Sequence, residues 1–279
     1  MTGAPPRLSP DDLRRFCDFL YARTGMMFGE SKRYYIERRL FDRMRIRDTS
    51  NFAAYFAVLR ADPAEAETVV DNFTINETYF YREDHQLRCL SQDILPEIVR
   101  TKRPGDKVRI WSQPCSTGEE AYSIAIWLLE NWPLVDAYNI EIVGSDIDAT
   151  ALATARAGRY SARSLSRLPE LVQSDYFEPA KRGGRAIIQD LKESVTFTQA
   201  NLIDRTSMIA QGAFEVIFCR NVLIYFDDSS RERAAANLFD CLTPGGFLCL
   251  GHSESMSRID ARFETRRFES AIVYQRPRP

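Results

Sequence analysis

Histidine is scarce in this sequence, and its cysteines are not paired by spacing. Only His85 and His252 occur in 279 residues, which leaves almost no material for a multi-histidine metal site or for a hydrolase whose histidine relays a proton. None of the six cysteines forms a C-x-x-C pair, so neither a zinc site nor a disulfide framework is indicated. We expect buried free thiols, no bound metal, and chemistry that uses other groups.

Long apolar stretches are missing too. No run approaches the roughly 18 residues that span a bilayer, and the N-terminal segment MTGAPPRLSPDD lacks the apolar core of a signal peptide. The formal net charge is -2, so no overall positive field holds the chain against nucleic acid or an anionic membrane. The composition is that of a globular protein, and we expect a cytoplasmic one without membrane insertion.

The first 60 residues are basic and helical in pattern, with 12 basic and 7 acidic side chains. Ser9 is typical of a residue that caps a first helix, which Gly25 would end. A second helix is expected after Ser31 and a third from Ser50 to just before Pro63. This pattern predicts a small helical bundle.

From about residue 105 the chain alternates strand and helix. Strands are expected in KVRIWS, IEIVGSD, VTFTQAN, FEVIFCRN and GGFLCLGH, and helices over about 119–131, 149–157 and 229–242. This alternation predicts an α/β fold with a doubly wound, mostly parallel, Rossmann-like sheet and a terminal antiparallel hairpin. We expect an all-α domain over 1–75, the sheet domain over 76–279, and a small antiparallel β-subdomain inserted at about 160–195.

The loops after the first two predicted strands suggest a ligand. A single glycine followed by Glu119 and Glu120 is a poor cradle for a pyrophosphate, because carboxylates repel phosphate, and it suits a cationic or neutral ligand better. Asp146 ends the second strand, where an acid usually accepts ribose hydroxyls. S-adenosylmethionine, a nucleoside with a sulfonium, meets both conditions. The alternative, left open by these residues alone, is that the two glutamates complement the helix dipole and Asp148 caps the next helix.

Two further segments carry unusual polar residues. FCRNVLIYF follows the fourth strand and brings Arg220, Asn221 and Tyr225 to the ligand-facing edge, although Tyr225 alone is equally consistent with a buried tyrosine whose hydroxyl is satisfied. NETYFYR, residues 76–82, packs polar and aromatic groups between the domains, which is odd for a linker.

Together these segments resemble the CheR family, chemotaxis-receptor methyltransferases that esterify glutamate side chains with S-adenosylmethionine. The resemblance covers essentially the whole chain, through NETYFYR, WSQPCSTGEEAYS, GSDID, QANL, FCRNVLIYF and LTPGGFLCLGHSE. It implies that Arg82 and Tyr225 lie beside the transferred methyl. It implies cofactor contacts at Asn76, Thr78, Arg82, Glu119, Asp146, Asn201, Leu202, Arg220 and Asn221. Mild departures are Tyr81, Gln113-Pro114 and Ala121, and Pro114 could shift the loop that meets the methionine moiety.

The implied chemistry needs little acid–base catalysis. A glutamate with a pKa near 4.3 is already ionised at neutral pH and needs no general base. We expect catalysis chiefly from in-line placement, with Arg82 orienting one oxygen of the acceptor and Tyr225 shaping the path of the methyl. S-adenosylhomocysteine would be the product.

The second predicted helix suggests a docking surface. It carries Lys32, Arg33, Arg38, Arg39, Arg43, Arg45 and Arg47. These cations form either an ordinary solvated face or, as the resemblance implies, a surface for the glutamate-rich cytoplasmic helical region of a chemoreceptor in sensory adaptation. A nucleic-acid role lacks interleaved aromatic residues that could stack on bases. We expect a monomer, and docking that does not depend on a receptor-tail peptide at the β-subdomain.

Two rival functions remain. Gly251–Ser255 (GHSES) resembles a hydrolase nucleophile turn, but its fifth position is Ser rather than Gly, and no clear helix follows. A domain that binds the cofactor but acts only as a signalling scaffold is the stronger alternative, against which the presence of Arg82 and Tyr225 argues.

Overall fold

The N-terminal part of the chain is a bundle of helices. A computed structural model describes residues 7–180 and 183–278. The helices of the bundle are α1 (Pro10–Thr24), α2 (Arg33–Ile46), α3 (Phe52–Ala61) and α4 (Pro63–Phe73), with a 3₁₀ turn at Glu30–Lys32. As predicted, the Ser9 side chain caps α1 and Gly25 ends it in the left-handed conformation, at φ 70°. The third helix is capped by Asn51 rather than beginning at Ser50.

Two helical stretches before the sheet were not predicted, and the first is α4, the last helix of the bundle. Asp62, which ends α3, also caps α4 by accepting hydrogen bonds from the backbone N–H groups of Ala64 and Glu65. A second unpredicted stretch runs through α5 (Asp84–Cys89), a π-helical segment (Leu90–Ile94) and α6 (Leu95–Val99).

The remaining chain forms a seven-stranded sheet and its helices. The strands are β1 (Lys107–Ser112), β2 (Asn139–Asp146), β6 (Val195–Gln199), β7 (Phe214–Cys219), β8 (Leu242–Leu250), β9 (Glu264–Arg267) and β10 (Ile272–Gln275). The helices are α7 (Glu119–Asn131), α8 (Ala149–Ala157), α11 (Arg205–Ile209) and α12 (Asp228–Cys241), with 3₁₀ turns at Val135–Ala137 and Leu223–Tyr225. These bounds match the predicted elements closely.

The order of the strands creates a switch point in the sheet. The order is β6-β2-β1-β7-β8-β10-β9, and only β10 runs antiparallel to its two neighbours. From β1 the chain builds outward through β2 to β6, and then crosses to β7 on the other side of β1. Ligands bind beyond the carboxyl ends of strands at such a point. The α/β prediction with a doubly wound, mostly parallel sheet and a terminal hairpin is confirmed.

Side chains on the two faces of the sheet pack into two separate hydrophobic cores. Val108 and Ile110 of β1 face the core shared with α5, α6 and α7, whereas Trp111 faces the core shared with the N-terminal helices, α11 and α12. Both faces of the sheet are therefore covered, as expected of a doubly wound fold.

The insertion is a separate three-stranded antiparallel sheet. Its strands are β3 (Arg159–Tyr160), β4 (Phe177–Pro179) and β5 (Arg185–Ile187), accompanied by α9 (Glu170–Tyr176) and α10 (Gln189–Glu193). This confirms the inserted subdomain; Lys181 and Arg182, within the predicted insertion, lie outside the described residues.

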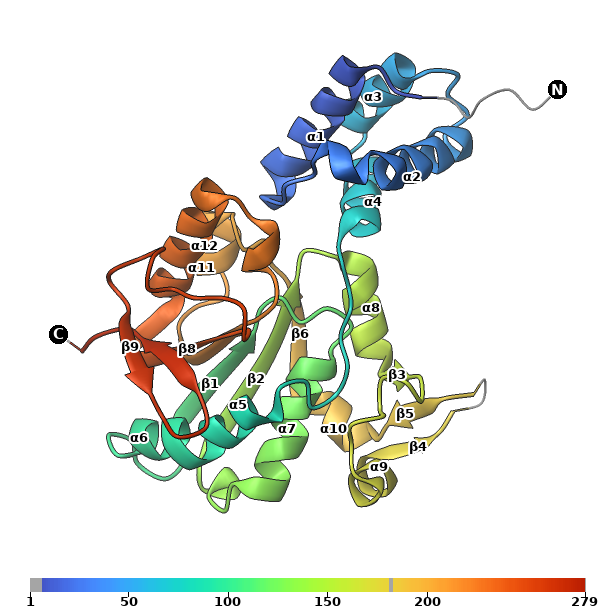
Figure 1. Cartoon of the computed structure of the whole chain (residues 1–279). Coiled ribbons are helices and arrows are strands. Elements are labelled where there is room, and N and C mark those ends of the chain that lie inside the picture. The colour runs from blue at the N-terminus through green and yellow to red at the C-terminus, as the bar shows by residue number, and fades with distance from the viewer. Residues whose placement is uncertain (1–6, 181–182, 279) are drawn as a thin grey trace.

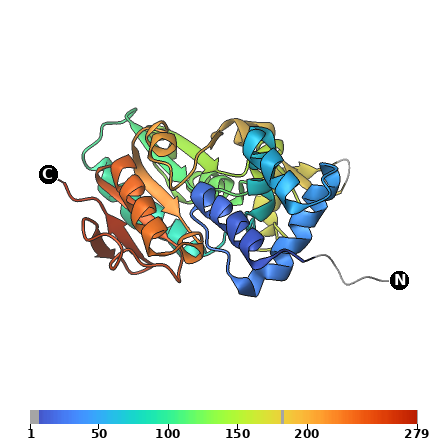
Figure 2. The ribbon, with the colours of Figure 1, turned by 90° about the horizontal axis from the view of Figure 1, so that it is seen from above.

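The helical bundle lies beyond the carboxyl ends of the parallel strands (Figure 1). Met26 pairs with Phe226 as an isolated β-bridge, and the Tyr21 hydroxyl donates to Asp227 Oδ2 at 2.9 Å. The view from above shows α1 on the side of the bundle that faces α12 (Figure 2). The bundle thus covers the edge where the switch point lies. No helix in the described ranges is long and apolar enough to cross a membrane.

Candidate active site

Two adjoining hollows lie at the switch point. The first, here the Asp146 hollow, is lined by residues that include Asp146, Asn201 and Leu202. The second, the Arg82 hollow, is lined by residues that include Arg82 and Glu120. Both hollows share Ile75, Pro114, Ser116, Asn221 and Tyr225. A ligand with two ends can therefore occupy both.

Asp146 ends β2 and is almost fully buried, at 3% exposure. Its Oδ2 accepts a hydrogen bond from the Ser116 N–H at 2.8 Å, and its Oδ1 accepts one from the Asp148 N–H at 3.0 Å. Burial raises the pKa of Asp146 to about 6, because these backbone donors offset only part of the desolvation. Such a carboxylate gains from any further donor, such as a ribose hydroxyl.

The other walls of the Asp146 hollow come from three parts of the chain. Asn201, after β6, donates from Nδ2 to the Arg23 carbonyl at 2.7 Å, so this asparagine is tied to the end of α1. Asn76 donates from Nδ2 to Asp148 Oδ2 at 2.6 Å. Thr24 and Met26 complete the wall from the helical bundle, which was not predicted.

Arg82 shares its hollow with two glutamates, Glu77 and Glu120, but pairs with neither of them. Its guanidinium donates from Nη1 to the Glu77 carbonyl at 2.9 Å, and across residues 7–180 and 183–278 it forms no ion pair. Tyr225, in the 3₁₀ turn after β7, is half-buried, and burial raises its pKa above the ordinary value. Within the described residues no hydrogen bond is made by its hydroxyl, so the interpretation of a buried, satisfied tyrosine finds no support.

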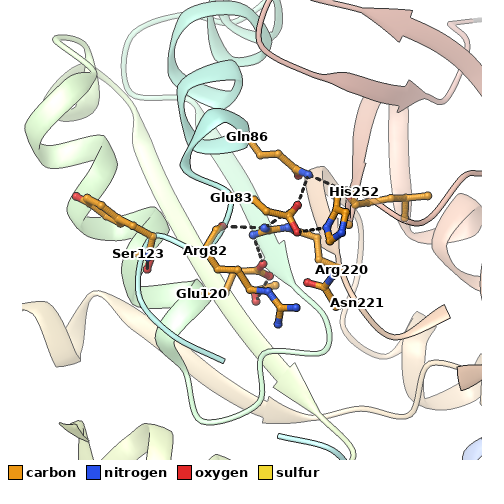
Figure 3. A network of polar contacts seen from close by, with 12 residues as sticks. Arg82, Glu83, Gln86, Glu120, Ser123, Arg220, Asn221 and His252 are labelled. Atoms are coloured by element: carbon orange, nitrogen blue, oxygen red, sulfur yellow. Dashed lines mark hydrogen bonds and ion pairs between the residues drawn. The ribbon is translucent and has the colours of Figure 1, made fainter. Parts of the chain in front are cut away.

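A buried network supports the Arg82 backbone (Figure 3). The Arg220 side chain, 3% exposed, donates from Nη2 to the Arg82 carbonyl at 2.7 Å and from Nη1 to Glu120 Oε2 at 2.8 Å. Its Nη2 also lies 3.1 Å from Glu83 Oε2, and Glu83 Oε1 lies 2.8 Å from His252 Nδ1. Burial opposes the charge of Arg220, yet the two glutamates raise its pKa above the ordinary value. Arg220 is thus neutralised internally, which leaves Arg82 as the cation that faces the hollow.

The structure brings together all but one of the predicted site residues. Those that line one or both hollows are Asn76, Thr78, Arg82, Asp146, Asn201, Leu202, Arg220, Asn221 and Tyr225. Glu119 lines neither: its carboxylate accepts from Ser164 Oγ at 2.8 Å and from Thr117 Oγ1 at 2.6 Å, beside the inserted subdomain.

Sequence reasoning gave no site role to Glu83, Gln86 or His252 of the network, and it named Glu120 only with Glu119 as part of the ligand loop. Glu120 lines the hollow in place of its neighbour Glu119 because consecutive residues on a helix point about 100° apart. Glu83 and His252 meet across 169 residues of sequence. The signal for Glu83 was its place directly after Arg82; nothing local signalled its contact with His252.

Comparison with known proteins identifies the family. The family model described as "CheR methyltransferase, SAM binding domain" matches residues 76–272, and "CheR methyltransferase, all-alpha domain" matches residues 11–74. The chain belongs to the CheR methyltransferase family. The resemblance drawn from the motifs is therefore confirmed.

Relatives match over nearly their full length. The chain is 46% identical over 272 residues to "Chemotaxis protein methyltransferase 2" of Vibrio cholerae serotype O1, covering 97% of this chain and 94% of that protein. It is 37% identical to "Chemotaxis protein methyltransferase 2" of Pseudomonas aeruginosa, covering 88% and 86%. Among solved structures it is similar to the N-methyltransferase NodS from Bradyrhizobium japonicum in complex with S-adenosyl-L-homocysteine, at 13% identity and TM-score 0.40, covering 74% and 92%.

As a member of this family the protein binds S-adenosylmethionine, which confirms the cofactor prediction. The residues at the switch point fit this group. Asp146 offers a buried carboxylate for hydroxyl donors, and no cationic side chain lines the Asp146 hollow in the part of the chain described. Nor do the described residues include a group of three His, Cys, Asp or Glu side chains that could hold a metal.

Proposed function

We propose that the protein transfers the methyl group of S-adenosylmethionine to glutamate side chains in the cytoplasmic helical region of chemoreceptors, forming methyl esters in sensory adaptation. It would act as a cytoplasmic monomer. The observation that supports an anionic acceptor is the guanidinium of Arg82, which lines the hollow next to the Asp146 hollow and forms no ion pair within the described residues. Glu120 in the same hollow already pairs with Arg220, and Glu77 with Arg163, so an anionic acceptor would give Arg82 a direct ion-pair partner.

We assign roles by the hollow that each residue lines. Asp146, Asn76, Asn201 and Leu202 would hold the nucleoside, and Thr78, Arg220 and Asn221 the region nearer the methyl. Arg82 and Tyr225 are the proposed catalytic residues. The placement of Glu119 offers no support for its predicted cofactor contact, which stays a prediction. We also propose a domain boundary after residue 75, which the matched family ranges 11–74 and 76–272 support.

Bound S-adenosylmethionine supplies an electrophilic methyl on a sulfonium. An oxygen of the acceptor carboxylate would form the new O–C bond while the S–C bond breaks, so that an anion and a cation would become a neutral ester and a neutral thioether without transfer of a proton. Arg82 would orient one carboxylate oxygen by a charge-assisted hydrogen bond and leave the other free to attack. In-line placement supplies up to about 7 to 11 kcal/mol in well-oriented systems.

The docking surface is narrower than the predicted basic helix. Four of its cations are already in ion pairs within the chain, Arg33, Arg43, Arg45 and Arg47. Arg39 stacks on Tyr35 and donates to the Asn72 carbonyl. Lys32 and Arg38 are exposed, and neither has an ion pair within the described ranges. Lys32 Nζ lies 5.7 Å from the centre of the Tyr225 ring, so this charge stands next to the Arg82 hollow.

The charge on α2 can be tested by salt dependence. Arg38→Glu should slow receptor methylation severalfold at low ionic strength and approach the wild-type rate at high salt, because salt screens exposed charges. Arg60→Glu, the same change at an exposed position on α3, is the matched control. Equal rates for both variants at low salt would remove α2 as the docking surface.

The reaction itself is tested by incubating the protein with methyl-labelled S-adenosylmethionine and receptor-bearing membranes, followed by alkaline treatment. A glutamate methyl ester releases labelled methanol under base, whereas an N-methyl group stays attached. Label that resists base would refute the proposed acceptor, and absence of label on any receptor would favour a scaffold.

A further inference from the structure

The Gly251–Ser255 turn after β8 resembled a hydrolase motif, and the proposed reaction gives it no role. In the structure it contacts both loops that carry the proposed catalytic residues. Its Glu254 reaches the loop after β7, and its His252 reaches the segment after Arg82.

Glu254 binds the backbone of the Asn221–Leu223 loop. Its Oε1 accepts hydrogen bonds from the N–H groups of Val222 at 2.9 Å and Leu223 at 2.7 Å, and its Oε2 accepts from those of Asn221 at 2.7 Å and Gly251 at 2.8 Å. All four are backbone donors, so both carboxylate oxygens are fully used inside the protein.

The loop that Glu254 holds lines both hollows. Asn221 has φ 59°, a left-handed conformation that is uncommon outside glycine but that asparagine tolerates. The absence of a side chain at Gly251 lets the turn pack closely against Asn221, because a Cβ there would lie 2.7 Å from Asn221 Nδ2 and 2.8 Å from Glu254 Oε2. Asn221 and Tyr225 line both hollows, so a shift of this loop would alter cofactor and acceptor sites together.

His252 reaches the other loop through Glu83. Glu83 also has a left-handed backbone, at φ 55°, and lies between His252 and the guanidinium of Arg220 (Figure 3). Arg220 in turn donates to the Arg82 carbonyl at 2.7 Å. This chain of contacts ends at the backbone of Arg82 and includes no residue of the Asp146 hollow.

We propose that the Gly251–Ser255 turn positions the two loops of the active site, Glu254 by holding the backbone of Asn221–Leu223 and His252 by holding Glu83 and, through Arg220, Arg82. Neither side chain is a catalytic residue. Glu254 acts on cofactor affinity and turnover together. His252 acts mainly on turnover, because its contacts end at the Arg82 backbone and Arg220, the residue between them, keeps its ion pair with Glu120. Only the turnover readout rests on the proposed function, since cofactor affinity is measured without an acceptor.

Glu254→Gln tests most directly whether Glu254 positions the Asn221–Leu223 loop. The amide keeps the shape but offers one oxygen to two of the four N–H donors and turns an NH₂ group toward the other two. We expect the dissociation constant of S-adenosylhomocysteine, measured by titration calorimetry, to rise about tenfold or more, the equivalent of about 1.4 kcal/mol. Glu269→Gln makes the same charge change at an exposed position near the same turn and should leave affinity unchanged. Equal affinities for Glu254→Gln and Glu269→Gln would overturn the positioning role of Glu254.

His252 variants test the positioning role of His252 without a risk to folding, because the side chain is 70% exposed. His252→Ala should lower kcat about tenfold with an unchanged dissociation constant for S-adenosylhomocysteine. His252→Asn places an amide N–H where Nδ1 lies and should restore most of the turnover. An unchanged kcat in His252→Ala, a loss of cofactor affinity there, or no rescue by His252→Asn would each overturn the positioning role.

These readouts separate the inference from the proposed function. If labelled methyl groups reach another acceptor, kcat is measured on that acceptor and the proposed function alone fails. If no acceptor is labelled, the calorimetry decides the role of Glu254. Should Glu254→Gln not fold, the His252 pair decides whether the turn positions the site.

Discussion

Cofactor affinity should fall as the pH is lowered from 7 to 5, because the proposed contact of Asp146 with the hydroxyls of a ribose is stronger when its carboxylate is ionised. Burial raises the pKa of this carboxyl to about 6 in the free protein. Hydroxyl donors favour the ionised form, so binding lowers the pKa of Asp146. Cofactor binding and proton binding at Asp146 therefore oppose each other.

The size of the effect follows from the pKa of Asp146. At pH 7 about nine-tenths of the free protein carries an ionised Asp146, and at pH 5 about one-tenth does. If the bound form stays ionised, the dissociation constant rises about tenfold over these two units, which corresponds to roughly 1.4 kcal/mol. Close to half a proton should be released for each cofactor bound at pH 6.

Stability should change in the opposite direction. A carboxyl whose pKa is higher in the folded than in the unfolded chain binds its proton more tightly in the folded state. Above pH 6, where Asp146 is ionised, this group therefore lowers the free energy of unfolding. That cost, on the order of 3 kcal/mol for a shift of about two units, is relieved as the pH falls from about 6 toward 4. Ionised Asp146 therefore lowers the stability of the free protein at the same pH at which its proposed contact with the cofactor is strongest.

Titration calorimetry with S-adenosylhomocysteine in two buffers of different ionisation enthalpy measures affinity and proton release in one series. Asp146→Asn is the matched control: it should bind more weakly at pH 7, by roughly 1.5 to 3 kcal/mol for a lost charged hydrogen bond, and show no pH dependence between 5 and 7. A wild-type dissociation constant that is flat over this range, or binding without proton release at pH 6, would refute the role of Asp146.

Three further changes have defined outcomes. Arg82→Ala should lower kcat about 100-fold through lost orientation and leave the calorimetric affinity for S-adenosylhomocysteine nearly unchanged; normal turnover would contradict the role of Arg82. Gly118→Ala should destabilise the fold by about 1 to 3 kcal/mol, measured by thermal unfolding, because Gly118 has φ 94° and a Cβ there would lie 2.8 Å from that of Ala155. Glu65→Gln should cost about 3 to 5 kcal/mol in the free energy of unfolding, since it leaves Arg43 beside a buried neutral group; a change below 1 kcal/mol in denaturant unfolding would argue against this ion pair.

Helices whose ends carry a capping residue and a terminating glycine could be predicted from the sequence. The helix expected over 149–157 matches α8, because Asp148 caps it and Gly158 ends it in a left-handed conformation. By contrast, Asp62 and Pro63 were interpreted only as the end of one helix, although the same pair begins the next. A single residue can end one helix and also cap the next, and the local sequence pattern does not show whether it has one of these roles or both.

The site was predictable where topology alone places a residue. Asp146, Asn201 and Asn221 follow parallel strands, and the carboxyl ends of parallel strands meet at one edge. The difference between Glu119 and Glu120 depends on the inserted subdomain, whose Ser164 hydroxyl donates to Glu119. Contacts set by a distant chain segment leave no local signal.

The charges around the two hollows favour an acceptor that is already an anion. Arg220 is neutralised by Glu120 and Glu83, and both oxygens of Glu120 are occupied, by Ser112 and Arg220. An amine or alcohol acceptor would have to lose a proton to a base. Tyr225 has a raised pKa and stays protonated at neutral pH, and the other carboxylate that lines the Arg82 hollow, Glu77, is exposed and pairs with Arg163. A carboxylate acceptor would need no such base and would pair with Arg82, whereas the amide of a glutamine offers neither the charge nor a comparable nucleophile. We therefore expect the proposed acceptor, glutamate, to be selected over glutamine by electrostatics and by the chemistry of the acceptor, since the two side chains are nearly isosteric.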